Sequence, residues 1–331
     1  MNKSTIGLAL LAACSTSAMA QSSVSIYGIV DAGLVRESGG PDGAVTNISS
    51  GIASGSRLGF KGKEDLGGGL SAVFGLEAAF NADTGASGQG GVLFGRQAFV
   101  GLNGKFGAVT LGRQYTPYYK TLRDIGDPFG AVSMAGRSGN LFATNTRANN
   151  MVEYVSPVFA GLRADLAWAP GEVAGDSARS RQLGGSVGYA AGPLTIQLAH
   201  HRIENPTATD RTRNTLVSAN YAFKPVTVYA SYAVNKGPAA ADSKDMLAGV
   251  SIPFGANKLL FSHVRHNDDT AANNDARQWG VAYDYFLSKR TDIYIAYAVI
   301  DNRNGAAFRV GNATDTGTGD KAFNLGLRHN F

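Results

Sequence analysis

The feature that most constrains this chain is a long series of segments, each about ten residues long, in which apolar and polar residues alternate. Alternation with a period of two predicts β-strands that have one apolar and one polar face. In the first segment, SVSIYGIVDAGLV, residues Val24, Ile26 and Leu34 share one face, and Ser25 and Asp31 share the other. The apolar face would be the core of a soluble sandwich, or it would face lipid around a barrel with a polar interior.

The number and spacing of these segments favour the barrel. An even number of strands is required if both ends of a barrel lie on the same side of a membrane. Alternation and turn signals together predict sixteen strands, near residues 23–35, 46–62, 69–81, 91–103, 106–115, 147–156, 160–169, 180–190, 194–203, 210–223, 225–234, 243–252, 257–266, 276–287, 290–300 and 320–331.

The connections between the predicted strands alternate in length. Short turns fall at 65–68, 103–105, 157–159, 191–193, 224–225, 253–255 and 287–289, and longer polar loops fall at 37–45, 83–90, 113–147, 170–179, 204–210, 235–242, 267–275 and 301–319. Short turns on one rim and long loops on the other are typical of outer-membrane barrels, whereas a sandwich has no reason to alternate so strictly. We therefore predict an all-β protein, a 16-stranded antiparallel transmembrane β-barrel.

Composition agrees with export into an outer membrane. Residues 1–20 resemble a cleaved signal peptide, with Lys3 before an apolar stretch and an A-x-A cleavage site ending at Ala20. Residues 21–331 then form a single barrel domain. Cys14 also lies in a lipobox-like sequence, but strand-like sequence begins at Ser23 and leaves no tether for a lipid anchor. No later stretch has the 18 consecutive apolar residues of a transmembrane helix. The net charge of +5 is modest and includes no Lys/Arg run, so nucleic acid is not an expected partner.

Rings near strand ends or on apolar faces, such as Tyr221, Phe223, Tyr283 and Tyr285, would form girdles at the two membrane interfaces, although core aromatics are the ordinary alternative. The final strand carries an apolar stripe that ends on Phe331. A terminal residue is usually frayed and polar, so this pattern predicts a docked closing strand. It also resembles the C-terminal signature that outer-membrane assembly machinery reads.

One connection is exceptional. The segment of about 116–146 has no lasting alternation, and it is rich in charge, glycine and aromatic residues. A loop of this length inside a compact domain is usually functional. We expect it to fold into the barrel and narrow the passage.

Several segments are similar to the general porins of Gram-negative outer membranes, in the beta-proteobacterial, neisserial-type branch. They are SVSIYGIVDAGL, SRLGFKGKEDLGGGLSAVFGLE, GRQAFVGLNGKFGAVTLGRQYTP, DPFG, VEYVSPVFAGL, YFLSKRTDIYIAYA and GLRHNF, spread over residues 23–331 in the family's order. The resemblance implies a homotrimer embedded in outer-membrane lipid, and passive diffusion of small hydrophilic solutes and inorganic ions. It also implies that the third loop folds inward to form a constriction.

Porins of this type resemble one another in placing basic side chains on the wall against acidic ones on the loop. Alternation around Leu58 and Phe60 points Arg57 and Lys61 inward, and alternation in LSAVFGLEA points Glu77 inward. Putting Phe99 outward points Arg96 inward but leaves Gln97 facing lipid. The predicted constriction residues are Arg57, Arg96, Arg147, Glu77, Asp124 and Asp127, with Lys61, Arg113, Arg123 and Arg137 as secondary pore-lining candidates.

The basic candidates outnumber the acidic ones, so we predict a moderate preference for anions. The alternative is that these arginines are merely solvated lumen residues. An enzyme is disfavoured because the five histidines form no triad or metal cluster in the sequence, and no cofactor is expected. A substrate-specific channel remains open, because Tyr115, Tyr118 and Tyr119 could begin an aromatic slide. A plugged anchor would need a plug domain, and no other segment is long enough.

Overall fold

The computed structural model describes residues 23–331, so the predicted signal peptide and Cys14 lie outside the described residues. The strands are β1 (Ser23–Gly40), β2 (Gly43–Ser50), β3 (Arg57–Gly67), β4 (Leu70–Ala79), β5 (Gln97–Gly104), β6 (Gly107–Tyr115), β7 (Arg147–Val155), β8 (Leu162–Ala169), β9 (Gln182–Ala191), β10 (Leu194–Glu204), β11 (Arg211–Ala222), β12 (Thr227–Lys236), β13 (Asp242–Phe254), β14 (Asn257–Asp268), β15 (Ala276–Phe286), β16 (Thr291–Asn302) and β17 (Lys321–Asn330). The short helices are α2 (Pro117–Thr121), the π-helical turn η2 (Leu122–Gly126) and the 3-10 turns η1 (Gln89–Gly91), η3 (Ser138–Asn140) and η4 (Pro238–Ala240).

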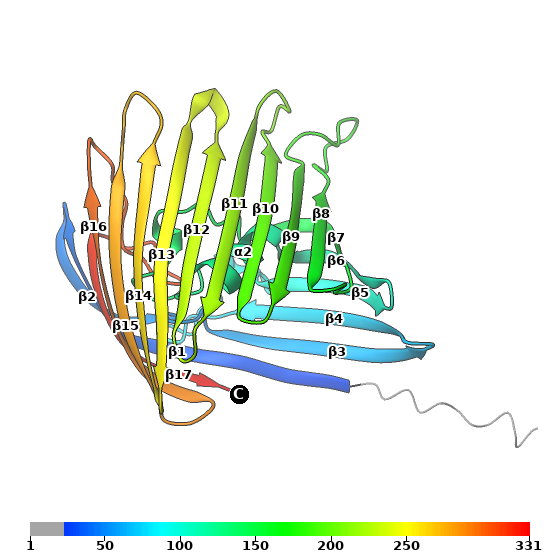
Figure 1. Cartoon of the computed structure of the whole chain (residues 1–331), viewed down its shortest axis with the longest axis horizontal. Coiled ribbons are helices and arrows are strands. Elements are labelled where there is room, and N and C mark those ends of the chain that lie inside the picture. Colours follow the sequence, from blue (N-terminus) through cyan, green and yellow to red (C-terminus); the bar gives the residue numbers. More distant parts are fainter. Residues whose placement is uncertain (1–22) are drawn as a thin grey trace, which may run out of the picture.

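The strands form one closed antiparallel ring, because β17 pairs with β1 (Figure 1). β1 is long enough to pair with two segments in turn. Its first half pairs with β3 and its second half with β2. β2 and β3 are therefore two pieces of one interrupted strand, and the ring is a barrel of sixteen strands, as predicted.

Side chains alternate between the two faces of the barrel as the sequence predicts. In β16, Tyr294 and Ala296 are almost completely buried on the inner side, whereas Ile293 and Ile295 are about 40% exposed on the outer side. Similar exposed apolar side chains recur on strand after strand. A continuous apolar outer surface is unfavourable in water and matches a barrel surrounded by lipid. Among residues 23–331, no helix is long and apolar enough to cross a membrane.

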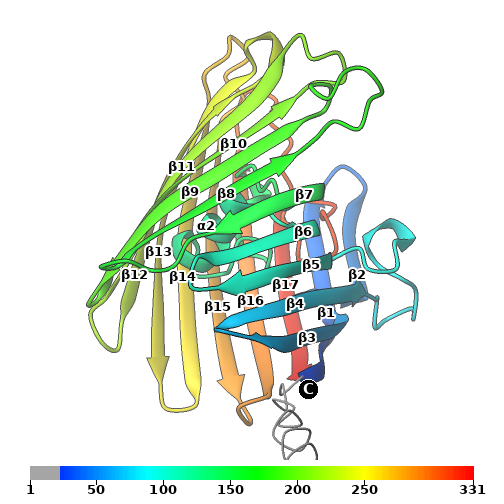
Figure 2. The same ribbon diagram turned by 90° about the vertical axis from the view of Figure 1, so that its right-hand side faces the viewer.

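Short turns gather at one rim and the longer loops at the other (Figures 1 and 2). One predicted long loop is wrong. Residues 37–45 are mostly strand, because β1 and β2 continue into a hairpin that leaves only Pro41 and Asp42 between them. The polar residues of this segment therefore belong to two paired strands that extend the hairpin, and not to a loop.

Residues 51–56, between β2 and β3, bend into the barrel, which alternation alone did not predict. The buried carboxylate of Asp31 holds the bend by accepting hydrogen bonds from the backbone N–H groups of Ile52, Ala53 and Ser54, at 3.2, 3.0 and 2.7 Å. The Tyr294 hydroxyl donates to the same carboxylate at 2.6 Å. These four bonds satisfy a charge that would otherwise be costly to bury.

Residues 116–146, between β6 and β7, fold inside the ring, and α2 lies within it (Figure 1). The Thr116 side chain caps α2 through the Tyr119 N–H. Lys120 forms ion pairs with Glu153 and Asp165 on β7 and β8, at 2.7 and 3.1 Å. These contacts fix the first part of the segment against the wall. We call residues 116–146 the inward loop.

The far part of the inward loop reaches the opposite wall. Ser262 and Gln278, on β14 and β15, donate hydrogen bonds to the Gly136 carbonyl at 2.9 and 3.2 Å. Asn324 on β17 accepts one from the Ala135 N–H at 2.8 Å. Residues 303–320, between β16 and β17, also fold inward, so Val310 is completely buried. Three segments therefore share the interior: the inward loop, the bend at 51–56 and the segment 303–320.

Candidate functional site

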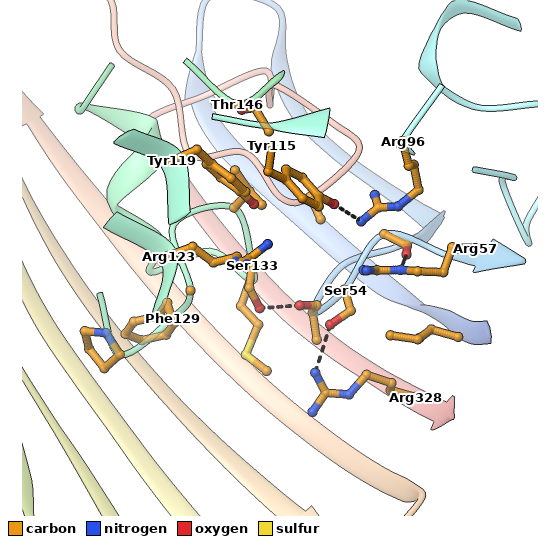
Figure 3. A pocket seen from close by; sticks show the side chains of 18 of the residues that line it. Ser54, Arg57, Arg96, Tyr115, Tyr119, Arg123, Phe129, Ser133, Thr146 and Arg328 are labelled. Carbon is orange, nitrogen blue, oxygen red and sulfur yellow. Dashed lines mark hydrogen bonds between the residues drawn. The ribbon is translucent and has the colours of Figure 1, made fainter. Parts of the chain in front are cut away.

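A water-accessible opening with a volume of about 590 Å³ lies between the inward loop and the wall. Arg57, Arg96 and Arg328 lie on one side of it, and Arg123 and Phe129 of the inward loop lie across from them (Figure 3). Its lining includes one acidic residue, Asp284, and six basic residues: Arg57, Arg96, Arg123, Arg147, Lys258 and Arg328. The electrostatic character of the opening is therefore strongly positive.

Arg57 and Arg96 share one buried carboxylate, that of Glu77 on β4. The Arg96 Nε donates to Glu77 Oε1 at 2.7 Å, and Arg57 Nη1 lies 3.9 Å from Oε2. Tyr27 donates to the same Oε2 at 3.1 Å. Glu77 is only 2% exposed, so it acts behind the two arginines rather than as an acidic wall facing solute. Two cations around one anion leave a net positive charge at the surface of the opening.

The outward position predicted for Phe99 is wrong. Phe99 pairs in register with Gly75, and Gln97 pairs with Glu77, so both side chains point inward with their partners. The Phe99 ring occupies the space that the missing side chain of Gly75 leaves. Arg96 precedes β5 and is not governed by strand alternation. The unfavourable lipid-facing position that this prediction gave to Gln97 therefore does not occur.

Tyr115, the last residue of β6, joins the arginines to one another. Its hydroxyl accepts hydrogen bonds from Arg96 Nη2 at 2.8 Å and from Arg147 Nη2 at 2.9 Å. The guanidinium carbons of Arg147 and Arg123 lie 4.5 and 4.9 Å from the centre of its ring, and Tyr119 stacks on it at 5.1 Å. Stacking on aromatic rings fixes the direction of guanidinium groups. Burial is the main cause that raises the pKa of Tyr119 to about 12, so this ring stays neutral.

Arg147 differs from the other arginines of the opening. Its remaining hydrogen bond goes to Gln89 Oε1 at 3.2 Å, and no carboxylate within residues 23–331 lies within 4 Å of it. Arg328, by contrast, makes a two-pronged pair with Asp292 at 3.0 Å for each bond. Arg147 is therefore an unneutralised charge beside the path of a solute.

Lys258 and Arg328 were missed as site residues. Arg328 could have been found from alternation, because Leu325 and Leu327 face outward and residue 328 must then face inward. Its partner in the β1 register is Asp31, another inward residue. Lys258 is the second residue of β14, near the rim of short turns, and nothing in its local sequence distinguishes it from a turn lysine.

The two acidic residues predicted on the inward loop do not line the opening. Asp127 is 3% exposed, and its carboxylate accepts hydrogen bonds from the N–H groups of Phe129, Ala131 and Ser138 at 2.8, 3.0 and 2.7 Å. Burial raises the pKa of this carboxyl, against the opposing effect of those bonds. Asp124 is 52% exposed and pairs with its neighbour Arg123 at 2.6 Å. The prediction of an acidic loop face needs correction: Asp127 holds the shape of the loop instead.

Of the secondary candidates, only Arg123 lines the opening. Arg137 donates hydrogen bonds to the Asn140 side chain and the Asn312 carbonyl, and so ties the inward loop to segment 303–320. Burial lowers the pKa of Arg137 to about 10, which leaves it charged at neutral pH. Arg113 donates to the Gly95 carbonyl at 2.7 Å, away from the opening. Lys61 faces inward over the Tyr27 ring, in a separate hollow.

Comparison with known proteins agrees with this arrangement. The family profile described as Gram-negative porin matches residues 7–305. The chain belongs to the Gram-negative porins. Among its relatives, this porin is 33% identical to "Outer membrane porin protein 32" of Delftia acidovorans and 29% identical to "Major outer membrane protein P.IB" of Neisseria meningitidis, each match covering the whole of both chains.

Solved porin structures give the same picture. The "Anion-selective porin from Comamonas acidovorans" superimposes with a TM-score of 0.80 at 29% identity, covering 94% of this chain and all of the other. "OmpT" of Vibrio cholerae in its trimer form gives a TM-score of 0.69 at 18% identity, which supports the fold alone. This porin is thus a β-barrel of the outer membrane. Within its described residues, no group of three His, Cys, Asp or Glu side chains could hold a metal ion.

The inward loop of the porin contacts the barrel wall closely where Gly136 of the loop meets Gly280 of β15. A Cβ placed on Gly280 of β15 would lie 2.5 Å from the Cα of Gly136 on the loop. We expect Gly280→Val to push the loop away from β15 toward the basic wall and to lower the single-channel conductance by at least half. Planar-bilayer recording measures this. The matched control is Gly188→Val, whose Cβ would meet only the flexible Gln197 side chain, at 3.1 Å. Equal conductance in the two variants would contradict the expectation.

Proposed function

We propose that this outer-membrane porin is a general diffusion channel for small hydrophilic solutes that conducts anions in preference to cations. The constriction is the opening between the inward loop and the wall, with Arg57, Arg96 and Arg147 as its main charged residues. The observation that supports this most directly is the ratio of six basic side chains to one acidic side chain in the lining. Basic side chains around a narrow passage lower the energy of an anion there and raise that of a cation.

The arginines are well suited to this role because their guanidinium groups stay charged at any physiological pH. Tyr115 and Glu77 hold three of them in place without covering them. The structural similarity to an anion-selective porin points in the same direction.

The first test is a reversal-potential measurement on the wild-type protein in a planar bilayer. With a tenfold KCl gradient, a perfectly selective channel would give about 59 mV. We expect a reversal potential of the anion-selective sign, about one third to two thirds of that limit. A potential near zero, or one of the cation-selective sign, would refute the proposed preference.

A substrate-specific channel is the second candidate, because the stacked Tyr115 and Tyr119 rings line the opening. Uptake of neutral sugars into liposomes separates the two. A smooth decrease in swelling rate with sugar size supports general diffusion, whereas saturable uptake of one sugar supports a specific site. We propose no catalytic activity for this porin.

The assembly and export of the porin also belong to the proposal. We expect residues 1–20 to be removed on export and the mature barrels to form homotrimers, which would appear as conductance steps in groups of three. Phe331 pairs with Gly28 through two backbone hydrogen bonds of 3.1 Å, and its ring covers that glycine. This docked terminus fits the expected recognition of Phe331 by outer-membrane assembly machinery.

A further inference from the structure

Two pairs of arginines face each other directly on the outer surface of the barrel. Arg265 of β14 lies opposite Arg277 of β15 in the strand register, and Arg202 of β10 lies opposite Arg213 of β11. Their outward direction follows from the buried neighbours on the inner side, which are Val264 and Gln278 for the first pair and His201 and Asn214 for the second. All four arginines lie near the strand ends that lead into the longer loops.

Like charges placed directly opposite each other destabilise a sheet unless an anion lies between them. Arg202 has such an anion, since its guanidinium pairs with Glu204. Within residues 23–331, no carboxylate lies within 4 Å of Arg213, Arg265 or Arg277. Asp301 of β16 lies opposite Arg277 in the strand register, but its carboxylate pairs with Arg303 at 3.3 Å.

Neighbouring lysines on the same rim show the opposite situation. Lys236 pairs with Asp242 at 2.5 Å, and Lys244 pairs with Asp269 at 2.8 Å. The barrel therefore neutralises some outward cations of this rim and leaves the arginine pair of β14 and β15 without an acidic partner. The Nε of Arg265 donates to the Asn267 side chain at 2.6 Å, which directs the guanidinium but does not neutralise it.

An aromatic cluster fixes the depth of this pair in the membrane. Trp279 lies two residues below Arg277 on the same outer face and is 49% exposed. The rings of His263 and Phe261 lie 4.0 and 5.6 Å from it. Exposed Trp residues of a barrel mark the boundary between hydrocarbon and headgroups. Two strand residues span roughly 7 Å, so the arginine pair lies at the level of the lipid headgroups.

We propose that Arg265 and Arg277 bind a phosphate group of an anionic lipid in the leaflet that faces the longer loops. Two guanidinium groups at one height offer several N–H donors to phosphate oxygens, which is the geometry in which arginine binds phosphate well. Arg213 supplies a further unneutralised charge on the same rim. This lipid site faces away from the channel, so it stands whether or not the proposed anion preference is correct.

The test measures the binding of bis-phosphorylated lipid A to the purified, folded porin in zwitterionic detergent micelles. The readout is fluorescence of the nearby Trp279, in a background in which the second tryptophan, Trp168, is replaced by Phe. The double variant Arg265→Gln/Arg277→Gln removes the site. The matched control, Lys289→Gln/Arg290→Gln, removes two exposed cations from the turn at the opposite rim. Unchanged single-channel conductance establishes that both variants are folded.

We expect the Arg265/Arg277 variant to bind lipid A at least tenfold more weakly than the wild type and the control. Lipid A lacking one phosphate should bind the wild type more weakly than the bis-phosphorylated form. Equal affinity of the two double variants would overturn the proposal. Competition by millimolar inorganic phosphate as strong as that by the lipid would overturn it too, because the site would then recognise the free ion rather than a headgroup.

Discussion

The double variant Arg57→Gln/Arg147→Gln is expected to lower the anion-to-cation permeability ratio by about tenfold and to move the reversal potential to zero or past it to the cation-selective sign. Two unit charges 6 Å apart in water interact with about 0.7 kcal/mol, so each arginine favours an anion and disfavours a cation by that amount. Losing two such charges would change the ratio by roughly a hundredfold without salt. Screening by mobile ions reduces the effect to about tenfold near 0.1 M.

The choice of these two arginines keeps the wall intact. Among the described residues Arg147 has no carboxylate partner to leave behind, and Arg57 lies 3.9 Å from Glu77, which keeps its 2.7 Å pair with Arg96. Substitution of Arg96 would instead leave Glu77 buried without its main partner, at a cost of several kcal/mol. The matched control is Arg113→Gln, which removes one positive charge close to Arg147 but away from the opening. A shift as large in the control would show that net charge, rather than position, sets the preference.

The second large effect concerns the loop. The Asp127→Ala variant is expected to release the inward loop, so that single-channel conductance rises and becomes noisy and larger sugars enter liposomes. The substitution removes the acceptor of three backbone N–H groups inside a buried turn. An unsatisfied buried donor costs about 1–3 kcal/mol, so the docked form of the loop loses roughly 3 kcal/mol or more.

Asp124→Ala provides the comparison for this variant. It removes a carboxylate three residues earlier on the same loop, but one whose side chain is 52% exposed and which forms an ion pair with its neighbour Arg123. An exposed pair of this kind contributes about 0–1 kcal/mol. We expect wild-type conductance and the wild-type size limit in Asp124→Ala. Identical behaviour of the two variants would contradict the structural role assigned to Asp127.

Alternation was sufficient to predict the barrel and part of its opening. Because a strand side chain can point only in or out, Arg57 and Glu77 followed from the apolar residues beside them. The same reasoning placed Arg96 in the opening, although alternation does not apply there because Arg96 lies outside a strand. It failed at Phe99, an apolar residue that faces inward because Gly75 leaves room for its ring. An apolar strand residue can therefore be assigned to the lipid-facing side only where the inner face of the barrel contacts water and offers no apolar packing site.

The remaining errors have a common physical cause. The role of Asp127 and the bend at residues 51–56 both depend on carboxylates that accept backbone N–H groups: Asp127 within its own loop, and Asp31 from residues more than twenty positions away. No periodic pattern encodes such bonds. An acidic residue in a loop looks the same in sequence whether it meets solute or caps a turn. Closure of the ring brings Lys258 and Arg328, on strands distant in the sequence, to the opening, although alternation alone would have pointed Arg328 inward.

The three inward segments support one another through their backbones. The Met134 N–H donates to the Ile52 carbonyl at 2.7 Å, and the Gly311 N–H donates to the Asn140 side chain at 3.1 Å. Ile52 and Val310 are completely buried, in one apolar cluster with Met134 and Leu141 of the inward loop. Deletion of the inward loop to widen the channel would therefore expose these apolar side chains to water in the pore. A successful redesign has to exchange those two residues for polar ones in the same step.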